Sequence, residues 1–102
     1  MSSRILFTRA PDGSFSFGES RLAGLVEQLY DGNPEPRIPA GLMAAASREL
    51  VAAIHKACAV HRTDFVKAAG LLVRERPALF RLTRCQAVHD GDHTADAEVV
   101  EP

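Results

Sequence analysis

Four histidines and two cysteines are the residues best suited to chemistry, and they fall into two groups. The groups are His55-x2-Cys58-x2-His61 and Cys85-x3-His89-x3-His93. Neutral imidazole and thiolate are the usual ligands of zinc, so a zinc-dependent module is one hypothesis. On a helix, however, His55 and His61 would be separated by about 120° and could not readily share one ion. We therefore expect no metal and no cofactor.

The same residues do not form an arrangement typical of an enzyme. Cys58 and His61 would be neighbours on a helix, but nucleophilic catalysis also needs a group that orients the histidine. The segment Asp90-Gly-Asp-His93 gathers two carboxylates and an imidazole where the sequence shows no apolar periodicity, so preorganisation is not expected. The sequence also lacks a phosphate-binding loop and a dinucleotide-binding fingerprint. We expect a protein that is not an enzyme.

Length and composition indicate one globular domain. The 102 residues suffice for a single core, and 46% hydrophobic with 25% charged residues is an ordinary globular balance. No apolar run approaches the roughly 18 residues that span a bilayer, and the first residues are too short and mixed for a signal peptide. We expect a cytoplasmic protein that does not insert into membranes and whose two thiols stay free.

The N-terminal residues predict a β-hairpin. Residues 4–9 and 14–17 are rich in β-branched and aromatic side chains, and Phe15 and Phe17 alternate with serines. Between them, Pro11, Asp12 and Gly13 provide the turn, because each favours a backbone conformation that turns require.

Three helices are predicted after the hairpin. Apolar spacing predicts the first over residues 20–31, with Ser20 and Gly32 as caps. A proline-rich extended connector follows at 33–39, and then a long, alanine-rich amphipathic helix at 40–61. The third helix begins at Thr63 or Asp64, has an inner stripe of Phe65, Ala69 and Leu72, and ends before Pro77. Residues 78–82 form one further helical turn.

These elements predict an α+β, mostly helical fold, with a β-hairpin, three helices and a short fourth helical turn. We place the globular domain at residues 1–84. Residues 85–102 carry five acidic residues and no basic one, a net charge of −5, and predict a flexible acidic tail.

A basic block spans residues 62–84, where six basic and two acidic residues give a net charge of +4. Its basic residues are Arg62, Lys67, Arg74, Arg76, Arg81 and Arg84. They follow or flank a possible helix-turn-helix, which suggests phosphate contacts and a nucleic-acid-binding regulator of the antitoxin-like or transcriptional kind. A solvated basic face is the simpler interpretation, because the turn lacks a glycine and aromatic residues are few.

The leading hypothesis is a small accessory or regulatory protein that binds a host or partner protein and modulates, for example inhibits, its activity. The seven last residues resemble the short acidic ends of some phage-encoded proteins, which suggests a phage or mobile-element origin in bacteria. The long helix has more apolar and alanine surface than one short helix can cover, which also suggests a homodimer. The predicted partner-binding residues are Ala45, Ala52, Ala59, Leu71, Arg37 and Ile38.

Overall fold

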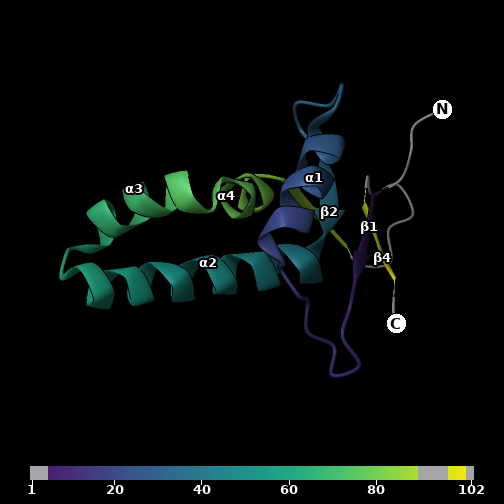
Figure 1. The fold of residues 1–102 in the computed structure, drawn as a ribbon. Helices are drawn as coiled ribbons and strands as arrows, with labels where there is room; N and C mark the ends of the chain where they lie inside the picture. Colours follow the sequence, from purple (N-terminus) through teal and green to yellow (C-terminus); the bar gives the residue numbers. More distant parts are fainter. Residues whose placement is uncertain (1–4, 90–96, 101–102) are drawn as a thin grey trace.

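The structure is a computed structural model that describes residues 5–89 and 97–100. Its elements in chain order are β1 (Ile5–Thr8), α1 (Glu19–Tyr30), β2 (Arg37–Pro39), α2 (Ala40–His61), α3 (Phe65–Glu75), α4 (Pro77–Thr83), β3 (Gln86–Val88) and β4 (Ala97–Val100) (Figure 1). The predicted α+β, mostly helical class is confirmed.

The turn predicted at residues 10–13 is present. The N–H of Ala10 donates to the carbonyl oxygen of Ser14 at 2.7 Å, and Gly13 adopts a φ of 89°. The carboxylate of Asp12 accepts hydrogen bonds from both the N–H and the hydroxyl of Ser14, and these bonds lower the pKa of Asp12. The turn residues therefore act locally as their types predict.

The two arms that leave this turn do not form the predicted β-hairpin. They share one isolated antiparallel bridge, between Arg9 and Phe15. β1 pairs instead with β4, in parallel and with Phe7 opposite Val99. The prediction was wrong because the half-buried rings of Phe15 and Phe17 pack against the core, so burial and not strand pairing holds the second arm.

The helices lie close to their predicted positions. α2 covers the predicted residues 40–61, and α4 begins with a proline, Pro77, which has no N–H to leave unsatisfied at a helix start. α1 is capped at Gly18 and not at the predicted Ser20, while Gly32 has the left-handed φ of 69° expected after a helix.

The segment after residue 84 is not the structureless tail that was predicted. β3 pairs in parallel with β2, and the N–H of Gln86 donates to the carbonyl oxygen of Pro36 at 2.9 Å. Ala97 is buried against the core. Acidic composition indicated a solvated tail, but the few apolar residues within it pair with strands distant in sequence. Residues 90–96 and 101–102, which carry most of the predicted tail's charge, lie outside the described residues.

Buried side chains form two separate clusters. The main core joins α1, α4, β2 and the first half of α2, and Ile38, Leu42, Leu79 and Leu82 are fully buried there. The second, distal cluster joins the last half of α2 to α3. Figure 1 shows α2 and α3 extending side by side away from α1 and the strands.

Candidate protein-binding surface

α2 and α3 form a helical hairpin, a name used below for residues 50–75. α2 ends where Arg62 adopts a left-handed backbone, with φ 50° and ψ 50°, and donates its N–H to the carbonyl oxygen of Cys58. Asp64, one of the two predicted caps, precedes α3, and its carboxylate accepts the N–H of Lys67 at 2.8 Å. This three-residue connection turns the chain back and sets α3 alongside α2.

A small core holds the helical hairpin together. The distal cluster contains only four buried residues, Ile54, Ala57, Ala68 and Leu72, two of which are alanines. Because alanine side chains are short, the two helices can approach closely but bury little apolar area. Each helix of the helical hairpin therefore buries a narrow face, and most of its other residues are exposed.

Exposed apolar side chains are concentrated on this helical hairpin. Every exposed large apolar residue that the structure describes lies between residues 51 and 73: Val51, Val60, Phe65, Val66, Leu71 and Val73. Val66 is 80% exposed and Val60 is 66% exposed. Single exposed apolar side chains are common, but their restriction to one segment indicates a surface suited to binding.

α3 carries the most regular part of this surface. Val66, Gly70 and Val73 are spaced i, i+4 and i+7, so they share one line along the helix, called here the outer face of α3. Lys67 and Arg74 are both exposed and border this line on one side. The outer face of α3 thus combines an apolar line with a positively charged border.

One ring contact joins the two helices at the end of the helical hairpin. The rings of His55 on α2 and Phe65 on α3 lie 5.6 Å apart in an edge-to-face arrangement. Phe65 was predicted to lie in the inner stripe of α3, yet nearly half of its surface remains exposed. Leu72 is buried as predicted, but Ala68 is buried where Ala69 was expected, and Ala69 is half-buried. The buried face of α3 is therefore rotated from the predicted one.

The predicted partner-binding residues divide into exposed and buried ones. Ala52, Ala59 and Leu71 are exposed, and Arg37 is half-buried. Ile38 and Ala45 are buried within the chain, so the prediction that they offer surface to a partner was wrong. The connector that contains Ile38 does not present an unpaired edge here, because β2 pairs with β3 along it.

Ala45 faces the segment that follows the N-terminal turn. A shallow groove of about 300 Å³ lies between this segment and α2, lined by Phe15, Phe17, Ala45 and Ala52 among others. The structure therefore brings Ala45 and Ala52 to one place, but it separates them from Ala59 at the far end of α2. The seven-residue alanine spacing does not form one continuous exposed stripe.

The six cations of the basic block do not form one patch. Arg76 donates a hydrogen bond to the carboxylate of Glu49 on α2 at 3.4 Å, and Arg81 lies over the ring of Tyr30. The remaining four, Arg62, Lys67, Arg74 and Arg84, are exposed. Two of the residues predicted to contact phosphates, Arg76 and Arg81, therefore make contacts within the chain.

A partly buried hydrogen-bond cluster joins α1 to α4. The hydroxyl of Tyr30 donates to the carbonyl oxygen of Arg81 at 2.8 Å, and the thiol of Cys85 lies 3.7 Å from that hydroxyl. Burial, together with the nearby Cys85 thiol, raises the pKa of Tyr30 to about 12. The phenol thus stays protonated and acts as a donor that fixes the two helices.

The two cysteine and histidine groups are not brought together. Cys58 packs beside the distal cluster, whereas Cys85 is buried in the main core. Over residues 5–89 and 97–100, no three His, Cys, Asp or Glu side chains are close enough to hold a metal ion. His93 lies outside the described residues. None of the described helices has both the length and the apolar character needed to cross a membrane.

Val60, Val66 and Val73 were not among the predicted site residues. The sequence carried a signal for Val66 and Val73, because α3 has more apolar residues than one helix face can bury. Val60 lies near the end of α2. Periodicity alone could not show which of them the short distal cluster would leave outside.

Comparison of this chain with protein families, with curated proteins and with solved structures found no match.

Proposed function

We propose that this chain is a small non-enzymatic accessory protein that binds another protein through the helical hairpin and modulates its activity. The observation that carries this proposal is that, among the side chains that the structure describes, every exposed large apolar one lies within residues 51–73. An interaction surface of this kind supplies binding energy without any catalytic group.

The exposed valines of α3 can supply binding energy. Fully burying a valine side chain contributes about 1.5–3 kcal/mol relative to leaving it in water. Val66 and Val73 contribute little of this to folding, because the chain leaves them exposed. A partner that covers them would gain this energy on binding, offset by the loss of motional freedom.

Nucleic acid is the second candidate partner class, and the exposure of Arg62, Lys67 and Arg74 favours it. Protein is the better supported class because Val66 and Val73 lie beside Lys67 and Arg74 on α3, and phosphates offer no apolar surface to bury them. An affinity that depends on phosphate contacts would also fall steeply with salt.

The test is capture from a lysate of the source cell with the tagged chain, with and without nuclease, followed by mass spectrometry. The double variant Val66→Asp with Val73→Asp should lose a stoichiometric protein that the unmodified chain retains after nuclease treatment. Ala23→Asp, at an exposed position of α1, is the matched control and should retain it. Circular dichroism checks that all three chains fold.

Two results would count against this function. Equal retention by the double variant would show that the helical hairpin is not the binding surface. Loss of all retained protein on nuclease treatment would favour the nucleic-acid alternative.

A further inference from the structure

We propose that the outer face of α3 seats a helix of the partner protein whose apolar stripe is bordered by carboxylates. This inference rests on the proposed function and names the chemistry of the partner at that surface. Three features of α3 support it: the spacing of its exposed valines, a glycine that the fold does not require, and positive charges along one border of the outer face.

The valine spacing matches a helix that lies along α3. The 11 residues of α3 form about three turns and extend about 16 Å. Val66 and Val73 stand at the two ends of the line, two turns apart. Side chains in such rows pack into the grooves of a facing helix, so the surface suits an extended helical contact.

Gly70 lies between the two valines and is not needed by the fold. A Cβ atom built there would meet no atom within 4 Å, and the φ of Gly70 is not positive. Glycine inside a helix is less favourable for folding than alanine, because its backbone loses more conformational freedom. The chain therefore gives up stability at a position where its absent side chain leaves a notch between Val66 and Val73, which a leucine of the facing helix can fill.

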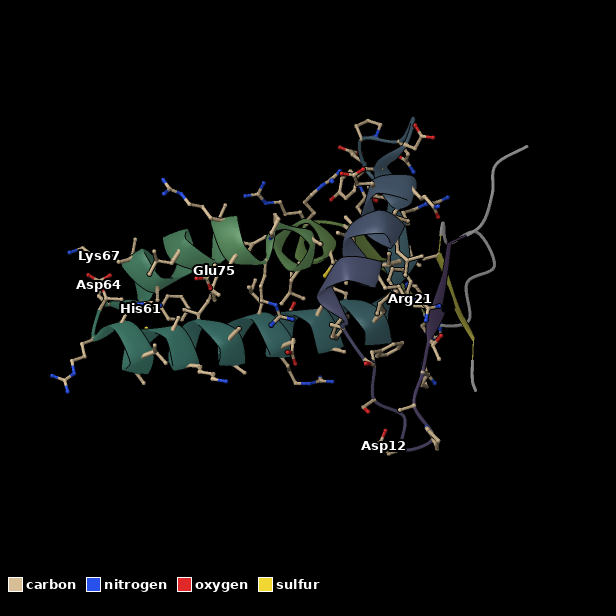
Figure 2. The ribbon with its side chains drawn as sticks, viewed as in Figure 1. Asp12, Arg21, His61, Asp64, Lys67 and Glu75 are labelled. Atoms are coloured by element: carbon tan, nitrogen blue, oxygen red, sulfur yellow. The ribbon has the colours of Figure 1, made fainter. Side chains whose placement is uncertain are left out.

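The charges on α3 select an acidic partner. Lys67 and Arg74 lie on the same border of the outer face, two turns apart. Glu75 projects from the opposite side of α3, toward α2, whereas Lys67 lies at the outer end (Figure 2). Carboxylates two turns apart on the facing helix would pair with both cations, and such complementarity speeds association and fixes register.

A second copy of the chain fits this surface poorly. The antiparallel pairing of two α3 helices that sets Val66 against Val73 of the other copy places the cations of both copies along one side of the contact. Like charges within the screening length, about 8 Å at physiological salt, repel one another. The same charges favour a different, acidic helix.

The test uses a displayed library of amphipathic helical peptides of about four turns, so that the probe spans α3. Each peptide carries a fixed leucine stripe, and the bordering positions vary among Glu, Lys, Gln and Ser. The library is selected against the full chain at physiological salt. Glutamates should be enriched on one border at a spacing of two turns.

The affinity of the enriched peptides is then measured for four variants of the chain. Lys67→Glu with Arg74→Glu should weaken binding about tenfold or more, because each lost charge pair becomes a repulsion. Gly70→Leu should also weaken it by filling the notch. Gly24→Leu on α1 is the matched control, since Gly24 is exposed and likewise has open space around a built Cβ. Val66→Asp with Val73→Asp should abolish binding.

The outcomes separate this inference from the proposed function. If the enriched peptides are neutral or basic, and their binding is lost in the double valine variant, the inference of an acidic partner is wrong but the proposed binding surface stands. Peptides that bind the double valine variant equally well, or no enrichment at all, would overturn both. If the chain associates with itself, and the double valine variant abolishes this association, the partner at this surface is a second copy of the chain and not an acidic helix.

Discussion

The hydroxyl of Tyr30 donates to the carbonyl oxygen of Arg81 at 2.8 Å, while the guanidinium of Arg81 lies 4.5 Å from the centre of the Tyr30 ring. One side chain of α1 thus contacts both the backbone and the side chain of one residue of α4. This contact joins α1 to α4, two helices of the main core. The helical hairpin extends from this core.

The titration of Tyr30 tests this contact directly. Tyr30 is the only tyrosine and the chain has no tryptophan, so the ultraviolet absorbance of tyrosinate reports this one group. Its pKa is raised from 10.0 to about 12 in the folded chain. The folded state therefore holds the proton more tightly, and the free energy of unfolding should fall as pH rises from about 10 to about 12.

Tyr30→Phe supplies the control for that titration. It removes the hydroxyl but keeps the ring beneath Arg81, and it should lower the free energy of unfolding in urea at neutral pH by about 1 kcal/mol. The fall in stability above pH 10 should also shrink in this variant. A phenol that titrates at the same pH in the folded and the urea-unfolded chain would contradict the contact.

The left-handed backbone of Arg62 predicts a stabilising substitution. A side chain in this conformation costs roughly 1 kcal/mol that glycine avoids, and glycine is the preferred residue after a helix. Arg62→Gly should raise the free energy of unfolding by about 0.5–1 kcal/mol in urea denaturation. Thr63→Gly, one residue later and without a positive φ, should lower it.

Leu71 and Leu72 are adjacent residues with opposite roles. Leu72 is 4% exposed within the distal cluster, whereas Leu71 is 37% exposed. Leu72→Ala should lower the free energy of unfolding by about 2–4 kcal/mol, and Leu71→Ala by less than about 1 kcal/mol. Equal losses for the two variants would show that α3 is rotated from the arrangement described above.

Gly70 predicts opposite effects on stability and on binding. Gly70→Ala should raise the free energy of unfolding by about 0.5–1 kcal/mol, because the helix interior favours alanine and the added Cβ meets nothing. The same change should weaken the peptides selected on α3. Thermal denaturation and peptide affinity measured on the same preparation test both effects, and a loss of stability would contradict the open position of Gly70.

Much of the helical framework could be predicted from local sequence. Asp64 is one of the two predicted caps of α3, Gly32 has a left-handed backbone just after the C-cap of α1, and α2 spans the predicted residues 40–61. These features depend on backbone preferences and on hydrogen bonds between residues a few positions apart. The turn with Asp12 and Gly13 belongs to the same class.

The candidate surface could be predicted only in part. Leu71, Ala52 and Ala59 are exposed as expected, but Ile38 and Ala45 are buried, and Val66 and Val73 were missed. Apolar spacing shows that a residue belongs to an apolar face. It does not show whether the chain supplies enough side chains to cover that face.

The sequence by itself determined the helices, the cap of α3 at Asp64 and the N-terminal turn, because these depend on short-range preferences. Only the tertiary structure decided that β1 pairs with β4, that the connector at 37–39 pairs with β3, and that the valines of α3 stay outside. These features depend on contacts between residues far apart in sequence. Such contacts form according to the total apolar area available for burial, which no local pattern contains.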